Sequence, residues 1–394
     1  MKKTIRAFCN FFVTAVAVII VLYISFFTDI PSKTGNVIKL KIEESQSEYE
    51  QYSESFEINE LTINMNSYYY NKLNDGQKKI YESIANAVKN FQSEFPIRDY
   101  VADNKENFAQ EVSVAIAAFI NDHPEVFYIE SQYSTYTLSG FNGDIGYIKL
   151  NYTESTLEDV NSKIEIIKQK IQEYITGTEN LSDYEKELYI HDKLAQNVTY
   201  SNLEDLPRAY HTAEGPFLEN IGVCDGFTKT LQILYDQLGI DSIIVLGVLD
   251  DNPHAWNLVN IEDNWYHVDL TSSRSIVEET GIITHAYFNL SDERMQKIAT
   301  FDNPELLPKA DSLDYNYYIY NDYVVYSTDD MSGKLNEIYQ DFKDKNYIEF
   351  YLEGNVSENI SSILVSLRRI ESNFLDGSKM YYYNIENAII IPKN

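Results

Sequence analysis

Only one cysteine lies outside the apolar N-terminal segment of this 394-residue chain, and a histidine and an aspartate follow it at short range. Cys224 stands in the segment Gly-Val-Cys-Asp-Gly-Phe, just before a pattern typical of a helix. His254 and Asp269 come next, each in a pattern typical of a strand. A thiol nucleophile needs a base to take its proton, and the base needs a group that orients it. The order thiol, imidazole, carboxylate therefore predicts a catalytic set of Cys224, His254 and Asp269.

The segment around Cys224 predicts how the thiol is activated. At the start of a helix, the dipole and the free backbone N–H groups favour a thiolate, and the same N–H groups can stabilise an oxyanion. Gly222 is expected to permit a tight turn into this helix. Gly226 is expected to leave room for a substrate backbone.

His254 and Asp269 are expected on neighbouring strands of one hairpin, His254–Ile261 and Trp265–Leu270, around the turn Glu262-Asp263-Asn264. A tight turn at Asp263-Asn264 would place Asp269 opposite Leu258, four residues short of His254. A wider loop, a bulge or strand twist must therefore close the gap between the imidazole and the carboxylate.

Plainer interpretations stay open for single residues. Taken alone, Cys224 could be a buried filler, His254 a turn histidine and Asp269 a strand-end carboxylate. His191 lies on an apolar helix face, which favours a hydrogen-bonded core histidine. Two further histidines, His211 and His267, show no paired ligand spacing for zinc. Neither a metal nor a cofactor is therefore expected. The two tryptophans are interpreted as core anchors of the hairpin, although either could edge the active cleft; they are Trp256 and Trp265.

The charge balance excludes one class of partner. The chain has 31 basic and 61 acidic residues, a formal charge of −30. Phosphate binding needs a basic surface, so a nucleic-acid partner is not expected. No acidic cluster has the spacing of a calcium-binding loop.

The N-terminus indicates export. Three basic residues precede an apolar run, Phe8–Phe27, that is long enough to span a membrane. No small-residue cleavage pattern follows, which favours an uncleaved signal-anchor over residues 1–30 rather than a removed signal peptide. Residues 31–56 are polar and predict a stalk, and Cys9 is interpreted as an apolar filler. The globular part would then be extracellular on a single-pass membrane protein, where a lone Cys224 is either buried or reactive.

The rest of the chain predicts three folded segments: an α/β N-terminal extension over 57–178, a catalytic domain over 179–312 and a small C-terminal α/β module over 313–394. Apolar residues at helical spacing predict two helices in the first segment; they are Ile80, Ile84, Val88 and Phe91, then Phe108, Val112, Ile116 and Phe119. Strands are expected near Val126–Leu138 and Ile145–Tyr152. Two capping boxes are expected to open the next helices; they are Ser155 with Glu158 and Ser182 with Glu185.

The motifs together resemble the bacterial transglutaminase-like superfamily. Three segments carry the resemblance, in the family's order and spacing: Gly222–Phe227, His254–Asn257 and Trp265–Thr271. Two more segments agree with it, Ile190–Asp192 and Thr212–Asn220, and it covers about residues 180–300. Leu270 stands where a proline is common in the family, and the residues after it lack an aromatic that often follows.

The resemblance implies a papain-like α+β fold, with an antiparallel sheet and a helix that bears the cysteine. It implies Cys224 as nucleophile, His254 as base and Asp269 as the orienting acid. The superfamily includes protein cross-linkers, peptidases, amidases and members without activity.

The sequence therefore predicts an extracellular, membrane-anchored thiol acyl-transfer enzyme that acts on protein or peptide amides of the cell envelope through a thioester. Hydrolysis is slightly favoured over cross-linking, because water is always available. The alternative is a catalytically silent surface scaffold of the same fold. A peptidoglycan hydrolase that uses the same thiol and imidazole is disfavoured by the two strand motifs.

Overall fold

The computed structural model describes residues 58–62, 67–102, 105–140, 143–326, 331–354, 356–371, 379–383, 385 and 387–393. The expected signal-anchor and stalk lie outside these residues. Within them, no helix is both long enough and apolar enough to cross a membrane. The chain divides into two compact units, Met1–Ile164 with Asn202–Leu206, and Glu165–Ser201 with Pro207–Asn394.

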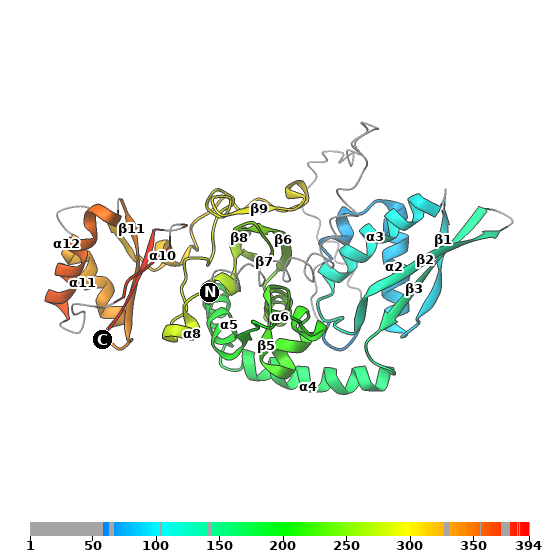
Figure 1. Ribbon diagram of the computed structural model, residues 1–394, viewed down its shortest axis with the longest axis horizontal. Coiled ribbons are helices and arrows are strands. Elements are labelled where there is room, and N and C mark those ends of the chain that lie inside the picture. Colours follow the sequence, from blue (N-terminus) through cyan, green and yellow to red (C-terminus); the bar gives the residue numbers. More distant parts are fainter. Residues whose placement is uncertain are drawn as a thin grey trace. The chain divides into compact units, whose positions relative to one another are not determined.

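The first unit packs two helices against a three-stranded antiparallel sheet in the order β1-β3-β2 (Figure 1). Its elements are η1 (Tyr70–Lys72), α2 (Asp75–Lys89), β1 (Glu94–Ala102), α3 (Lys105–Asp122), β2 (Ile129–Gly140), β3 (Gly143–Tyr152) and the start of α4 (Leu157–Ile175). The apolar residues expected on the helix faces are buried, apart from Phe91. Phe91 lies beyond the end of α2 in the left-handed region and stacks on Tyr152 instead.

Side-chain caps begin the next two helices. Ser182 and Glu185 form the expected capping box at α5 (Asp183–Asn197). The first expected box is wrong by one residue, because α4 begins at Leu157 and the Asp159 N–H donates to the Thr156 hydroxyl at 3.1 Å. Thr156 and Asp159 thus make the contact expected of Ser155 and Glu158.

The second unit is built on a four-stranded antiparallel sheet in the order β8-β7-β6-β9, beside which lies α6, the helix that begins with the cysteine (Figure 1). Its main elements are α6 (Cys224–Gln237), β6 (Ser242–Leu249), β7 (Asn252–Ile261), β8 (Asn264–Val268) and β9 (Ala299–Phe301). Shorter elements connect them: β4 (Thr199–Tyr200), η2 (Arg208–His211), η3 (Gly215–Glu219), β5 (Ile221–Gly222), α7 (Leu270–Ser273), α8 (Val277–Thr280), α9 (Asp292–Met295) and η4 (Pro304–Leu306). This mixed helix and strand architecture confirms the expected α+β fold class.

The turn between β7 and β8 sets the register of the hairpin. Its two central residues are Glu262 and Asp263, both at positive φ, and Ile261 pairs with Asn264. The hairpin therefore turns within the expected stretch Glu262-Asp263-Asn264, one residue earlier than a tight turn at Asp263-Asn264 would place it. In the register that forms, each residue of β8 pairs two positions nearer the start of β7 than expected, and Leu258 pairs with His267.

The C-terminal module packs two helices on a mixed sheet in the order β10-β11-β13-β12 (Figure 1). Its elements are α10 (Tyr317–Tyr320), β10 (Val324–Tyr326), α11 (Met331–Phe342), β11 (Tyr347–Glu353), α12 (Val356–Ile370), β12 (Tyr381–Tyr383) and β13 (Ala388–Pro392). The helices bury an apolar face against β11 and β13, with Leu335, Phe342 and Leu367 in that core. Strands and helices alternate from β10 to β12, and β13 follows β12 directly.

Candidate active site

Cys224 is the first residue of α6 and is half-buried. The parallel pairing of β4 with β5 leads the chain to this point, and the Val223 N–H donates to the Tyr210 carbonyl oxygen at 3.0 Å. Val223 is the N-cap and its apolar side chain accepts no hydrogen bond from the first turn. The thiol therefore sits at the positive end of the helix, as the sequence predicts.

The glycines that flank Cys224 let the chain pack against itself. A Cβ at Gly222 would come within 2.9 Å of Pro216 Cγ, and a Cβ at Gly226 would collide with the Tyr210 carbonyl oxygen. The expectation that Gly226 leaves room for a substrate backbone is therefore wrong, because the chain's own loop fills that space.

The structure brings His254 and Asp269 together. The distance from His254 Nε2 to Asp269 Oδ2 is 2.8 Å. His254 lies near the start of β7, and Asp269 directly follows β8 as the N-cap of α7. In the observed register Asp269 continues opposite Trp256, so His254 is its diagonal neighbour, within reach of an imidazole. No bulge or wide loop is needed.

Ser272 holds the Asp269 carboxylate in place. The Ser272 N–H donates to Oδ1 at 3.0 Å and the Ser272 hydroxyl donates to Oδ2 at 2.5 Å. Both contacts arise because Asp269 caps a short helix whose third residue is Ser272. The carboxylate is 1% exposed, so its hydrogen bonds are shielded from water.

The charges of the pair support each other. Burial alone would raise the pKa of Asp269, but His254 and then Ser272 hold it below its usual value. Burial alone would lower the pKa of His254, but the Asp269 carboxylate and the Cys224 thiol raise it well above its usual value. An imidazolium next to a carboxylate is therefore favoured in this site near neutral pH.

The Cys224 thiol lies next to His254, whose pKa it helps to raise. Because Nε2 of His254 is engaged with Asp269, Nδ1 is the ring nitrogen left for the thiol. The three predicted site residues thus form one continuous chain from sulfur to carboxylate.

Tyr200 also lies against the cysteine, and sequence reasoning missed it. It lies close enough to Cys224 for the two residues to affect each other's charge, and β4–β5 pairing places Tyr200 beside Gly222. Burial and the neighbouring acidic groups raise the pKa of Tyr200, so its phenol keeps its proton. Its one sequence signal, an aromatic residue after a predicted helix, is too common to single it out.

The other candidate histidines lie outside this chain of contacts. His211 Nδ1 is 3.2 Å from the carboxylate of Asp225, the residue after the cysteine. His191 is a buried core histidine, as expected, and His267 contacts the Trp256 indole.

A second histidine cluster resembles a metal site. The ligand atoms of His191, Asp192 and His285 lie within 4.8 Å of one another. However, His191 Nδ1 and His285 Nε2 both face Asp192 Oδ1, at 2.9 and 3.1 Å, and His285 Nδ1 faces Glu349 Oε2 at 2.8 Å. Burial would lower the pKa of His285, but the two carboxylates raise it to about 10. A protonated imidazole offers no lone pair to a metal, so we interpret the cluster as a buried chain of ion pairs.

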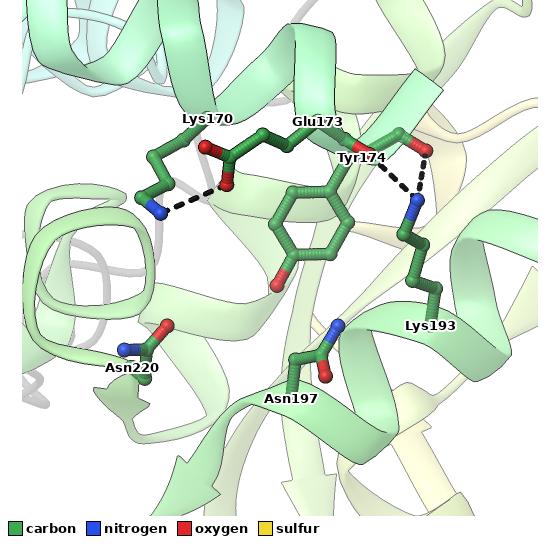
Figure 2. A pocket seen from close by; sticks show the side chains of 6 residues that line it. All are labelled: Lys170, Glu173, Tyr174, Lys193, Asn197 and Asn220. Atoms are coloured by element: carbon green, nitrogen blue, oxygen red, sulfur yellow. Dashed lines mark hydrogen bonds and ion pairs between the residues drawn. The ribbon is translucent and has the colours of Figure 1, made fainter. Parts of the chain in front are cut away.

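A cavity of about 380 Å³ lies elsewhere in the second unit (Figure 2). In Figure 2 the Tyr174 hydroxyl points toward the side of the cavity where Asn197 and Asn220 lie, while Lys193 donates to the Glu173 and Tyr174 carbonyl oxygens at 2.7 and 2.9 Å. None of its lining residues belongs to the cysteine site. The Lys193 ammonium is already hydrogen-bonded to the last turn of α4.

Comparison with known proteins places the site in a recognised domain. Residues 169–270, a segment that includes all three predicted site residues, match the model of the transglutaminase-like superfamily. No curated protein matches the chain significantly.

Two solved structures resemble part of the chain. One is described as a TGase; it is 16% identical, with a TM-score of 0.27, over 35% of this chain and 44% of that one. The other is a candidate cysteine protease from Cytophaga hutchinsonii; it is 19% identical, with a TM-score of 0.23, over 36% of this chain and 63% of that one. The chain thus spans less than two thirds of either protein.

Proposed function

We propose that this protein is a cysteine-dependent acyl-transfer enzyme that acts on protein or peptide amides. The observation that carries the proposal is the continuous contact from the Cys224 thiol through His254 to Asp269, with 2.8 Å between His254 Nε2 and Asp269 Oδ2. A buried carboxylate that orients an imidazole beside a thiol is the arrangement that nucleophilic catalysis requires.

In the resting site the proton of the Cys224 thiol is already on His254 Nδ1, and in the first step the thiolate sulfur attacks the amide carbonyl carbon. The tetrahedral intermediate collapses when the C–N bond breaks and His254 returns that proton to the leaving nitrogen, which leaves a thioester on Cys224. Asp269 keeps the imidazole in place and stabilises its charged form throughout.

In the second step water or an amine attacks the thioester. His254 takes a proton from the attacking group and gives it to the departing sulfur, so the thiol is restored. Water gives a peptidase or amidase reaction, and a lysine amine gives a cross-link. We favour hydrolysis, with substrates in the cell envelope and the enzyme held at the outer face of the membrane by its N-terminal segment.

Two donors are available for the oxyanion of both steps. They are the Cys224 backbone N–H and the hydroxyl of Tyr200, the residue that lies beside Cys224. The Tyr200 hydroxyl can turn its hydrogen to the negatively charged oxygen as it forms, whereas the backbone N–H is fixed and would donate to an oxyanion that forms in front of it.

The first test measures alkylation of Cys224 by iodoacetamide at pH 6 in the full chain. A Cys9→Ala background leaves Cys224 as the sole thiol. We expect alkylation at least about tenfold faster than that of a free thiol, because a neighbouring imidazolium stabilises the thiolate. His254→Ala should reduce the rate to that of a free thiol.

A matched control is Asn252→Ala, an exposed position on the same strand as His254. This control should alkylate like the parent protein. If the parent reacts no faster than a free thiol, Cys224 is not activated and a silent scaffold of the same fold becomes the better interpretation.

A second experiment identifies the acyl donor and shows whether water or an amine is the acceptor. Incubation with envelope proteins, followed by mass spectrometry of the Cys224 peptide, should trap the acyl group and identify the donor. Ammonia or new N-termini released without incorporation of a dansylated amine would support hydrolysis. Incorporation of the amine as the main product would contradict the preference for hydrolysis and favour cross-linking.

A further inference from the structure

Trp256 lies beside the imidazole of the candidate active site. It follows His254 by two residues on β7, so both side chains are on the same face of the strand. The two rings are nearly parallel, with 23° between their planes and 5.9 Å between their centroids. The indole is 1% exposed, so it forms a fixed, dry wall next to the His254 ring.

The orientation of this indole is fixed by His267. The Trp256 Nε1–H donates to His267 Nδ1 at 2.8 Å. An indole nitrogen can only donate, so Nδ1 of His267 must be the unprotonated acceptor and its proton must be on Nε2. That Nε2–H donates to Asp292 Oδ1, again at 2.8 Å. His267 is fully buried, and both contacts are satisfied by one tautomer.

Two close neighbours restrict the orientation of the Trp256 indole. A Cβ at Gly247, the residue that pairs with His254 on β6, would come within 2.8 Å of Trp256 Cη2. The indole therefore occupies the space of a missing side chain. On another side, the ring of Phe301 meets the indole at 62°, with centroids 5.7 Å apart.

The contact between Trp256 and His267 obeys the same register as the contact between His254 and Asp269. Leu258 pairs with His267, so Trp256 is the diagonal neighbour of His267 just as His254 is of Asp269. One register thus sets both hydrogen bonds. The buried contact between Trp256 and His267 lies next to the less buried contact between His254 and Asp269.

We propose that His267 and Asp292 are positioning residues of the candidate active site, which hold the Trp256 indole so that the indole fixes the ring plane of His254. The inference rests on the proposed function, because it assigns a role in orienting the base. Asp292 acts only through His267, and His267 acts only through Trp256. Neither residue contacts the reacting atoms.

The test compares two substitutions of one residue. His267→Phe keeps an aromatic ring but removes the acceptor for the indole. His267→Asn places an amide oxygen near the position of Nδ1 and restores an acceptor. In a Trp265→Phe background, the indole N–H signal in an NMR spectrum of the full chain belongs to Trp256. Its hydrogen exchange should be at least about tenfold faster in His267→Phe than in the parent and should recover in His267→Asn.

The second readout is alkylation of Cys224 between pH 5 and 9 in the same variants. His267→Phe should slow alkylation at pH 6 by about tenfold and leave the rate at pH 9 nearly unchanged, because only the imidazole-dependent thiolate is lost. His267→Asn should recover most of the rate at pH 6. A merely structural role of His267 would not produce a loss that depends on pH and is rescued by one acceptor.

The outcomes separate the two proposals. If the parent protein alkylates no faster than a free thiol, the proposed function fails, whatever the indole signal does. If Cys224 of the parent is alkylated rapidly at pH 6 and the alkylation rate of His267→Phe depends on pH in the same way, the positioning role is overturned while the proposed function stands. If the hydrogen exchange of the Trp256 indole N–H is the same in His267→Phe as in the parent, the hydrogen bond from Trp256 to His267 is wrong and the proposal fails.

Discussion

The acidic member of the candidate site has more partners than a triad requires. Asp269 accepts hydrogen bonds from His254, from the Ser272 hydroxyl and from the Ser272 N–H. Three donors on a buried carboxylate keep it ionised, and the ionised carboxylate keeps the imidazole charged. The helix cap thus serves local structure and the chemistry of the site at the same time.

A prediction at the scale of the residue concerns Tyr200. Acylation of Cys224 by p-nitrophenyl acetate passes through an oxyanion, whereas alkylation by iodoacetamide does not. Tyr200→Phe removes one proposed oxyanion donor, so we expect acylation to slow by about 10- to 100-fold while alkylation keeps its rate. The release of p-nitrophenol and the loss of free thiol measure the two rates. Equal slowing of both would show that Tyr200 acts on the sulfur rather than on the oxyanion.

At the scale of the element, the β7–β8 turn does most to assemble the site. Both central residues of the turn have positive φ, 51° at Glu262 and 63° at Asp263. A non-glycine side chain pays a conformational penalty there, and Asn-Gly is the preferred pair for such a turn. The natural residues keep the register without being the most stable choice.

The double substitution Glu262→Asn with Asp263→Gly should therefore raise the free energy of unfolding by about 1 kcal/mol. Denaturation in urea, followed by tryptophan fluorescence, measures the change. Because the register is retained, Cys224 should alkylate at the parent rate. A stabilised protein with slow alkylation would mean that the hairpin had shifted and His254 had lost Asp269.

At the scale of the whole molecule, one buried carboxylate joins the C-terminal module to the domain that bears the cysteine. Glu349 lies on β11 and is fully buried. It accepts hydrogen bonds from the His285 ring, the His285 N–H and the Tyr318 hydroxyl, each at 2.8 Å. Asp192, on α5, faces the other nitrogen of the same ring. The imidazolium of His285 therefore sits between carboxylates from two segments of the second unit.

This arrangement predicts how stability depends on pH. The pKa of His285 is raised to about 10, above its value of about 6.5 in an unfolded chain. The folded state therefore holds the proton more tightly, and the stabilisation is complete below pH about 6.5 and declines as the pH rises toward 10. Urea unfolding of the full chain at several pH values should show this decline.

Glu349→Gln removes one carboxylate and leaves the His285 charge partly uncompensated. At pH 6 we expect it to lower the free energy of unfolding by about 3 kcal/mol and to flatten the decline with pH. Glu353→Gln, an exposed position on the same strand, is the matched control and should change little. An unchanged pH dependence in Glu349→Gln would contradict the assigned ion pairs.

Much of the fold could be predicted because its signals are local. Helical spacing located α2 and α3, and a capping box located the start of α5. The box at α4 was displaced by one residue, since Ser155-Thr156 and Glu158-Asp159 offer two equivalent pairs and only the geometry of the helix start selects one. The polar stretch Glu262-Asp263-Asn264 located the hairpin, but only the pairing of the strands selects which two of its residues form the turn.

The residues that could react were predictable without a structure: a lone thiol at a helix start, and an imidazole and a carboxylate on consecutive strands. Side-chain type and spacing carry that information. The tertiary structure alone decided the partners that lie far apart in the chain: the tyrosine brought to Cys224 by β4–β5 pairing, the loop carbonyl that fills the space at Gly226, and Glu349 beside His285. Such contacts depend on which faces pack together, and packing is a property of the whole chain that no short segment encodes.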